Sequence, residues 1–366
     1  MLIKFKVNKF RGFSQELCWD LSSPSNYEYN TFAIKNGIIK NGIVFGPNGS
    51  GKSNFSKSIF DIIYHLSPKE KFADYYHTYV YAGTPESLVD FEYTFKFDTS
   101  IIVYAYSKNA TGALMSESLV VDGRQIFSRC QGKLDFDTQE FPLNQDTLNT
   151  LANNANNISI VNFLLLSYPL NANHYLLQLR EFVNGMLWFV NLDFRGYMGL
   201  ELGSANLQEY IIKNELVDKF ATFLKDISGQ EYEFIRPHAD DKTLYCSFGA
   251  NKVPFLNIVS TGTSALMLIF FWLQRLNNAT FVFVDEFDAF YHFDLSKKVC
   301  QALFSLDCQV FTTSHNTALM SNDLLRPDCY FILDNNKIKP FYQCTDKELR
   351  FAHNLEKMYR GGALEV

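Results

Sequence analysis

The pattern of hydrophobic and polar residues changes several times along the chain, and its first part predicts a strand–loop–helix unit. Residues 2–8, LIKFKVN, alternate with a period of two, which is typical of a strand with one buried face. A second strand is predicted at 36–45, NGIIKNGIVF, and it leads directly into a glycine-rich stretch. Residues 52–66 then carry apolar side chains at helical spacing, which predicts a helix after the glycines.

The middle of the chain divides into a β-rich part and a helical part. Residues 88–129 hold runs rich in Val, Ile, Tyr and Phe that are separated by turn sequences, which predicts an antiparallel β-meander. From about 140 to 225 the pattern is helical, and this includes the segment 174–190, HYLLQLREFVNGMLWFV. No heptad pattern persists over three or four repeats, so no long coiled coil is expected.

The last third of the chain returns to alternating helices and strands. Residues 281–284, FVFV, form an uninterrupted apolar run, which is expected of a parallel strand buried on both faces. Around it, the pattern predicts helices at 260–276 and 295–306, a strand at 308–315 and a terminal hairpin at 329–342. Together these elements predict an α/β protein.

Composition narrows the class of protein. Hydrophobic residues make up 47% of the 366 residues, as in globular proteins, and the formal net charge of −6 argues against a basic surface over the whole molecule. Seven scattered cysteines without a C-x-x-C pair indicate a reducing compartment and no structural zinc. No signal peptide is evident, and the apolar runs are too short to span a bilayer. A cytoplasmic protein without membrane contact is therefore expected.

The glycine-rich stretch at 43–55, IVFGPNGSGKSNF, carries the first candidate chemistry. From Gly46 to Ser53 it follows the pattern G-x-x-x-x-G-K-S, between a predicted strand and a predicted helix. The backbone N–H groups of such a loop, with the N-terminus of the next helix, bind phosphate. Lys52 is expected to bridge the β- and γ-phosphates of a nucleotide, and the Ser53 hydroxyl is expected to ligate Mg²⁺.

Two acids, Asp285 and Glu286, directly follow the apolar strand at 281–284. They therefore lie at the carboxyl end of a buried strand, where ligands bind in open α/β sheets. Asp285 is expected to hold Mg²⁺, and Glu286 is expected to orient or deprotonate an attacking water. The alternative is an acidic helix start without a catalytic role.

Two further segments, which contain Ser260 and His315, are candidates for the same site because of their position in the chain. Ser260 opens an apolar helix with a cluster of small residues, 25 residues before Asp285, although by itself this is only an N-cap. His315, in the sequence TTSHN, ends the strand that follows the acidic one. A lone histidine is usually structural, but this one is expected at the same sheet edge, and we predict that it contacts the γ-phosphate.

The order of these motifs resembles the ABC-type ATPase heads of the SMC group. More narrowly, it is similar to the ATPases of bacterial defence loci, which include RloA-like proteins, OLD-family ATPase domains and AriA of the PARIS system. Residues 8–13 match the opening strand of these heads, and residues 91–129 match their β-lobe. Residues 46–54 match the Walker A motif, 284–292 match Walker B with the D-loop, and 313–316 match the segment with the switch histidine. The resemblance implies an α/β, ABC-type, SMC-like P-loop ATPase head with an antiparallel β-lobe and a compact helical insertion. The chain would divide at 1–135, 136–235 and 236–366.

In such heads, ATP and Mg²⁺ lie between two protomers. The resemblance implies that Ser260 and Gly262 of one protomer contact the γ-phosphate held by the other, and that Asp288 lies across the dimer seam. Arg11 would contact the nucleotide phosphates. The catalytic residues would be Glu286 and His315, and the metal ligands Ser53 and Asp285. The nucleotide-binding residues of the loop would be Gly46, Asn48, Gly49, Ser50, Gly51, Lys52, Ser53 and Asn54.

The chain departs from the pattern of these families in three places. Residues 259–263 read Val-Ser-Thr-Gly-Thr, where transporters have Leu-Ser-Gly-Gly-Gln. Phe293 follows His292, where relatives often have proline, so a role for His292 is doubtful. No Q-loop glutamine is assigned, and Gln139 and Gln145 are only candidates.

The functional hypothesis rests on two features of related ATPases that this sequence does not show, a long coiled coil and a nuclease domain. The long heptad arms of SMC proteins are absent, and about 50 residues follow His315, too few for the Toprim nuclease of OLD-type enzymes. We therefore expect an ATPase that associates with itself and acts as sensor or scaffold of an anti-phage defence system, with a phage protein as a possible trigger. It would control a separately encoded effector, with a Toprim-type nuclease as the candidate.

Three other functions were considered. An SMC-like DNA-binding repair or maintenance clamp is the first alternative, although the acidic net charge counts against it. Whether DNA or RNA is bound stays open. A self-contained toxin ranks lower because 140–225 shows no catalytic set, and the deviating signature disfavours a transporter subunit.

Overall fold

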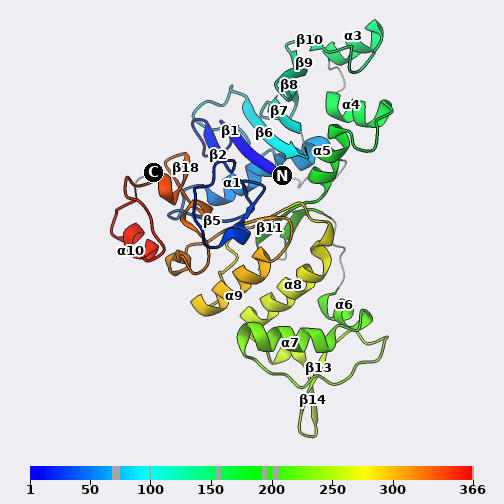
Figure 1. The fold of residues 1–366 in the computed structure, drawn as a ribbon. Coiled ribbons are helices and arrows are strands. Elements are labelled where there is room, and N and C mark those ends of the chain that lie inside the picture. The colour runs from blue at the N-terminus through cyan, green and yellow to red at the C-terminus, as the bar shows by residue number, and fades with distance from the viewer. Residues whose placement is uncertain (68–74, 99, 154–157, 192–195, 201–205, 365–366) are drawn as a thin grey trace.

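Two seven-stranded sheets form the centre of the protein. The computed structural model describes residues 1–67, 75–98, 100–153, 158–191, 196–200 and 206–364. In Figure 1, the antiparallel sheet with α3 lies at one end of an elongated molecule, and the hairpin of β13 and β14 lies at the other end. None of the helices in these ranges is long and apolar enough to cross a membrane.

The first sheet is mainly parallel, in the order β12–β11–β15–β16–β5–β17–β18. Its strands are β5 (Asn41–Phe45), β11 (Met186–Asn191), β12 (Gly196–Gly199), β15 (Phe281–Val284), β16 (Gln309–Thr313), β17 (Tyr330–Asp334) and β18 (Lys337–Pro340). Strands β11, β15, β16, β5 and β17 run parallel, whereas the edge strands β12 and β18 are antiparallel. Every residue of β5, β15 and β16 is buried, as the uninterrupted apolar run of β15 predicted.

The second sheet is antiparallel throughout, in the order β10–β9–β8–β7–β6–β1–β2. Its strands are β1 (Leu2–Asn8), β2 (Leu17–Asp20), β6 (Val89–Phe97), β7 (Ser100–Lys108), β8 (Leu114–Val121), β9 (Arg124–Cys130) and β10 (Lys133–Phe136). The predicted first strand and the predicted β-meander are thereby confirmed. Alternate residues of β6 are buried, so that its aromatic side chains cover the inner face of this sheet.

The helices connect and cover the two sheets. They are α1 (Lys52–Ile59), α2 (Asp61–Leu66), α3 (Gln145–Asn153), α4 (Ile160–Ser167), α5 (Tyr175–Asn184), α6 (Leu207–Lys213), α7 (Val217–Ser228), α8 (Thr261–Arg275), α9 (Phe293–Phe304) and α10 (Leu355–Arg360). Two small two-stranded sheets pair β3 (Ile34–Lys35) with β4 (Ile38–Ile39), and β13 (Tyr245–Phe248) with β14 (Asn251–Pro254).

Helix α1 lies between the two sheets. Its Phe55 ring packs against Trp19 of the antiparallel sheet at 5.2 Å between ring centroids, and against Phe283 of the parallel sheet at 6.2 Å. The same Trp19 ring contacts Phe311 of β16 at 4.6 Å. Because aromatic rings bury large areas, this contact is expected to hold the helix after the glycine loop in one position.

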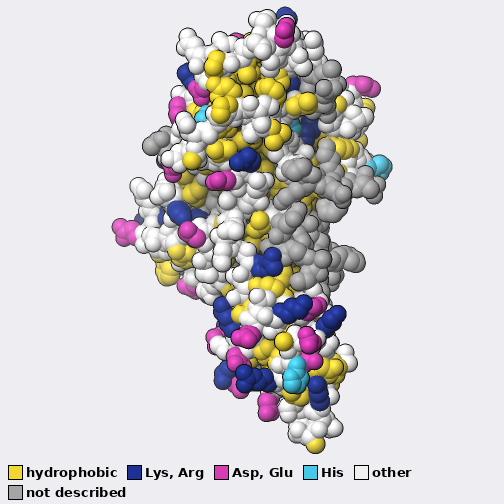
Figure 2. All heavy atoms as spheres, turned by 90° about the vertical axis from the view of Figure 1, so that its right-hand side faces the viewer, with side chains coloured by type: hydrophobic (Ala, Val, Ile, Leu, Met, Phe, Trp, Pro, Cys, Tyr) yellow, Lys and Arg dark blue, Asp and Glu magenta, His cyan; other side chains and the backbone are white. Residues whose placement is uncertain are grey.

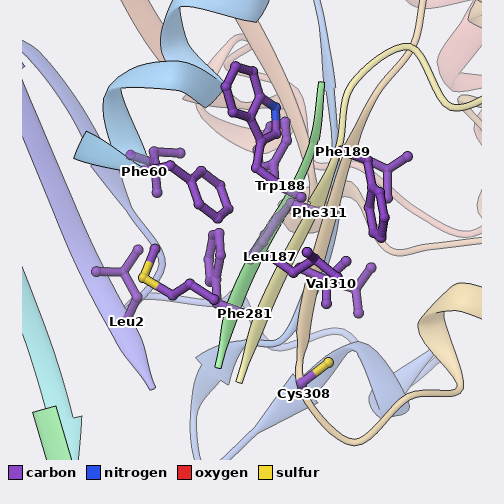
Figure 3. Close-up of a cluster of buried hydrophobic side chains, with 14 of the residues drawn as sticks. Leu2, Phe60, Leu187, Trp188, Phe189, Phe281, Cys308, Val310 and Phe311 are labelled. Carbon is purple, nitrogen blue, oxygen red and sulfur yellow. The ribbon is translucent and has the colours of Figure 1, made fainter. Parts of the chain in front are cut away.

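The prediction that residues 174–190 are helical is wrong for the last part of this segment. Helix α5 ends before Gly185, and the apolar residues after it form β11, which pairs in parallel with β15. Trp188 stacks on Phe60, whereas Phe189 stacks on Trp272 of α8, so the two faces of β11 pack against different elements (Figure 3). A short apolar run has no periodicity that separates a buried strand from a helix. The three-part division of the chain stays a prediction, but its middle part contributes a strand to the central sheet.

Two further predictions, a helix at 52–66 and a terminal hairpin, are compared here with the elements that form. The helix predicted at 52–66 is divided at Phe60 into α1 and α2. The predicted terminal hairpin is confirmed, with Asn335 and Asn336 in its turn at φ values of 49° and 62°. Two consecutive residues with positive φ are the mark of a type I′ turn, which asparagine tolerates well.

A buried polar cluster ties α2 to the antiparallel sheet. Asp61, the first residue of α2, is fully buried, and its carboxylate lies 2.5 Å from the Lys108 ammonium. It also accepts hydrogen bonds from the hydroxyls of Tyr75, Tyr79 and Tyr106 at 2.7–2.9 Å. A buried charge without such partners would be costly, so the cluster depends on the carboxylate.

We predict that Asp61→Ala lowers the free energy of unfolding by about 3–5 kcal/mol, because Lys108 loses its buried carboxylate partner. Urea unfolding followed by circular dichroism measures this. Asp307→Ala is the control, since Asp307 is 94% exposed in its pair with Lys35, and its loss should cost less than about 1 kcal/mol. Equal losses in the two variants would contradict the prediction.

Candidate functional site

Three loops that the sequence singled out meet at one edge of the parallel sheet. They follow the carboxyl ends of β5, β15 and β16, which are neighbours in the order β15–β16–β5. The loops are the glycine loop at 46–51, the acidic turn at 285–288 and the segment at 314–316. Because parallel strands end at the same edge, these loops enclose one site.

The glycine loop follows a path that only glycine allows at two positions. A Cβ atom on Gly46 would lie 2.4 Å from the Leu333 carbonyl oxygen, and Gly51 has a φ of 98°. A Cβ on Gly51 would lie 2.9 Å from the Phe13 ring. At the tip of the loop, Asn48 and Gly49 are exposed. The loop is therefore a close-packed turn that directs the start of α1 toward the sheet edge.

Lys52 lies inside this turn and is nearly completely buried. Its ammonium donates to the carbonyl oxygens of Gly46 at 2.8 Å and Pro47 at 3.1 Å. Burial lowers the pKa of Lys52, and the carboxylates of Glu286 and Asp285 oppose this. Lys52 therefore brings a positive charge to the N-terminus of α1, whose backbone already favours anions.

The acidic turn begins with Asp285, which is 4% exposed. Burial raises the pKa of Asp285, whereas the nearby Ser53 and Thr313 hydroxyls lower it. Ser53, the second residue of α1, thus lies close to Asp285 at the end of β15. Two oxygen-bearing side chains, one from each loop, meet at the positions expected for a magnesium site.

Glu286 and His315 form a second contact between the loops. The Glu286 carboxylate lies 3.3 Å from Nε2 of His315, and both side chains are partly exposed. Nδ1 of the same His315 ring lies 3.5 Å from the Lys52 ammonium. Glu286 has a φ of 46°, a left-handed conformation that costs a residue other than glycine about 1–3 kcal/mol. Such strain is most often found at functional sites.

Asp288 and the expected signature residues lie beside this group. The Asp288 carboxylate accepts a hydrogen bond from the Ser314 hydroxyl at 2.7 Å, and burial raises the pKa of Asp288. Gly262, in the first turn of α8, packs closely on the same turn, because a Cβ there would lie 2.9 Å from the Phe290 carbonyl oxygen. Ser260 is exposed and caps α8 by accepting the Thr263 N–H at 3.2 Å.

The comparison with known families agrees with this arrangement of motifs. Residues 43–321, about three quarters of the chain, match the AAA_21 family, which is described as "AAA domain, putative AbiEii toxin, Type IV TA system". The chain belongs to this AAA family. Among curated proteins, no relative matches it.

Solved structures that are similar to this AAA-family chain include three SMC heads. One is the SMC head bound to the C-winged helix domain of ScpA, with 14% identity, a TM-score of 0.47, and coverage of 92% of this chain and 96% of that one. The SMC head domain from Thermotoga maritima has 15% identity, a TM-score of 0.46, and coverage of 92% and 97%. The head with an extended coiled coil, bound to the C-terminal domain of ScpA derived from Pyrococcus furiosus, has 14% identity, a TM-score of 0.44, and coverage of 92% and 95%.

The predicted fold class is confirmed. The chain is an α/β protein of the AAA family, with a parallel sheet at the P-loop motif and an antiparallel β-lobe beside it. The narrower likeness to RloA-like proteins, OLD-family domains and AriA stays a prediction.

The other residues predicted for the site differ in how near to it they lie. Arg11 directs its guanidinium group toward the backbone oxygen of Tyr75 at 3.0 Å, while Phe13, in the same segment, packs on Gly51. A contact between Arg11 and phosphate stays a prediction. Gln139 and Gln145 lie after β10 and at the start of α3, at the far end of the antiparallel sheet from α1 (Figure 1).

His292 is the N-cap residue of α9, but its side chain makes no capping hydrogen bond. Its backbone carbonyl accepts the Ser296 N–H at 2.8 Å.

Sequence reasoning missed two hydroxyl residues of the site. Thr313 contacts the Asp285 carboxylate and the Glu286 backbone N–H, and Ser314 contacts the Asp288 carboxylate. Both belong to the quoted sequence TTSHN, in which only the histidine was assigned a role. Small hydroxyl residues at the end of a strand beside an acidic strand end would have been the available signal.

We predict that Gly46→Ala destabilises the protein by more than about 2 kcal/mol, because its Cβ would meet backbone that cannot move aside cheaply. Thermal unfolding measures the change. Gly49→Ala is the matched control, since it has a φ of 80° but nothing lies within 4 Å of its Cβ. It should therefore show only the conformational cost of about 1–2 kcal/mol. A Gly49→Ala loss as large as that of Gly46→Ala would contradict the prediction.

Proposed function

We propose that this chain binds ATP with Mg²⁺ and hydrolyses the γ-phosphate bond. The observation that carries the proposal is the position of His315 at the start of α1, where one ring nitrogen lies 3.5 Å from the Lys52 ammonium and the other lies 3.3 Å from the Glu286 carboxylate. A cation, an imidazole and a carboxylate from three loops meet where a glycine loop and a helix N-terminus favour phosphate. Phosphoryl transfer depends mainly on such positioned charges.

The residues present fit ATP and Mg²⁺. The close-packed turn has no room for a side chain at Gly46 or Gly51, as expected of a loop whose backbone N–H groups bind phosphate. Ser53 and Asp285 would hold Mg²⁺, because both offer the oxygen ligands that this ion prefers. When bound, the ion would neutralise charge on the β- and γ-phosphates.

Each side chain then has a distinct part in hydrolysis. Lys52 would exchange its carbonyl partners in the loop for the β- and γ-phosphate oxygens. Glu286, which is partly exposed, would accept a proton from the attacking water or orient it. His315 would contact the γ-phosphate, while its Nε2, 3.3 Å from the Glu286 carboxylate, helps to keep that carboxylate in position.

A second copy of the chain would complete the site. Ser260 is exposed at the N-terminus of α8, a helix of 15 residues, so its end is available to a nucleotide held by another protomer. Gly262 and the turn with Asp288 pack together beside it. This supports an ATP-dependent dimer or larger oligomer, in which Ser260 and Gly262 of one protomer contact the γ-phosphate held by the other.

For the biological role, we propose a cytoplasmic sensor or scaffold in anti-phage defence. The family description names a toxin–antitoxin system, and the order of motifs resembles that of defence ATPases. The chain would hold a separately encoded effector, with a Toprim-type nuclease as the candidate, and release or activate it after a phage protein triggers turnover. Co-purification from the native operon tests this, and the absence of any cognate partner would contradict it.

The charge distribution does not favour the alternative of a DNA clamp on the face seen in Figure 2. Lysines and arginines in the lower part of that view alternate with acids instead of forming a stripe. Two ion pairs, Lys213 with Glu209 in α6 and Lys225 of α7 with Glu231, neutralise basic side chains. DNA binding depends on unneutralised lysines and arginines, so affinity for duplex DNA that falls steeply with salt would revive the clamp.

We predict that Glu286→Gln lowers ATP turnover by about a hundredfold or more, because glutamine cannot accept a proton from water. ATP should then remain bound, and mass photometry with Mg·ATP should show oligomers that persist. Glu348→Gln is the control, since Glu348 is 74% exposed and pairs only with a surface arginine among the described residues. Unchanged turnover in Glu286→Gln would refute its assignment as the base.

A further inference from the structure

The hydroxyl group of Thr313 joins the two acids of the site. Thr313 is the last residue of β16 and is fully buried. Its Oγ1 donates to the Asp285 carboxylate at 2.5 Å and accepts the backbone N–H of Glu286 at 2.7 Å. One hydroxyl therefore contacts the expected magnesium ligand and the backbone of the expected base.

The direction of these two bonds follows from the groups involved. A backbone N–H can only donate, so the Thr313 oxygen must accept from Glu286. The single hydroxyl proton then remains for the Asp285 carboxylate. Serine could make both bonds, whereas valine and alanine could make neither.

The backbone geometry gives this hydroxyl a mechanical role. Strand β15 ends at Val284, and the Asp285 N–H still bonds to Phe189 of β11 at 3.1 Å. At Glu286 the chain turns into a left-handed conformation with a φ of 46°. The Thr313 hydroxyl accepts the hydrogen bond of the Glu286 N–H at this turn, and the Glu286 carboxylate lies near His315.

We infer, on the basis of the proposed hydrolysis, that Thr313 is a positioning residue for that reaction. It holds the Asp285 carboxylate and the strained Glu286 backbone in one mutual arrangement, and it touches neither the nucleotide nor the water. Displacement of a catalytic group by about 1 Å can cost about a hundredfold in rate, so loss of both bonds should act mainly on the chemical step.

The neighbouring Thr312 offers a matched control. It lies in the same strand and is also fully buried, but successive side chains of a strand point to opposite faces. Among the residues that the structure describes, its hydroxyl has no hydrogen-bond partner. Thr312→Val therefore makes the same chemical change one position away without removing a hydrogen bond.

The experiment compares Thr313→Val with Thr312→Val in the full chain. Steady-state ATP turnover gives kcat, a fluorescent ATP analogue with Mg²⁺ gives the dissociation constant, and thermal unfolding reports on folding. We expect kcat of Thr313→Val to fall by about a hundredfold, with a dissociation constant that changes much less. Thr312→Val should match the wild type in kcat and in the dissociation constant, and it should be at least as stable, because valine replaces a buried hydroxyl that has no partner among the described residues.

Thr313→Ser and Thr313→Ala keep the test decisive if the valine variant does not fold. They differ from each other by one hydroxyl group, and the serine variant should turn over ATP at least about tenfold faster than the alanine variant. A purely structural role would lower the melting temperature of both without separating their kcat values.

The experiment distinguishes failure of the proposed hydrolysis from failure of the role of Thr313. Wild-type protein that binds ATP but does not turn it over would contradict the proposed hydrolysis and, with it, the role of Thr313. Wild-type protein that is active, with serine and alanine variants equally fast, would overturn the role of Thr313 alone.

Discussion

The site depends on one constraint, the parallel pairing of β15, β16 and β5 in register. Residues Val284, Thr312 and Ile43 lie side by side in this pairing, and β15 ends there, β16 one residue later and β5 two residues later, so the three strands end at the same edge. Each strand is followed by a loop with different chemistry: an acidic turn, a histidine segment and a glycine loop. If one strand slipped by a single residue, its side chains would exchange faces, and the contacts among the loops would be lost.

The helix after the glycine loop is held by packing that lies away from the site. Phe55 of α1 is enclosed between Trp19 and Phe283, one from each sheet. At the start of α2, directly after α1, the buried Asp61 binds Lys108 of the antiparallel sheet. The N-terminus of α1 is therefore directed at the sheet edge by apolar contacts and by an ion pair, not by the loop alone. This arrangement lets the strained residues of the loop and the acidic turn keep their conformations.

The contacts within the site suggest how its parts act together. His315 lies between the Lys52 ammonium and the Glu286 carboxylate, so a ligand that attracts Lys52 would also change the surroundings of the base. Ser314, next to His315 in the chain, bonds to Asp288 in the turn that packs on Gly262. The region proposed to sense phosphate and the region proposed to meet a second protomer are thus joined through adjacent residues of one short segment.

The sequence by itself determined the local features: the strands at 2–8 and 281–284, the meander, the glycine loop, the acidic pair and the histidine. These follow from short patterns whose physical cause is local, namely alternation, apolar runs and turn chemistry. Only the tertiary structure decided that Met186–Asn191 is a central strand, because burial on both faces by Phe60 and Trp272 removes any periodicity. It alone also showed that Thr313, not Thr312, bonds to the acids, since that depends on the register between two strands and on which face each side chain occupies.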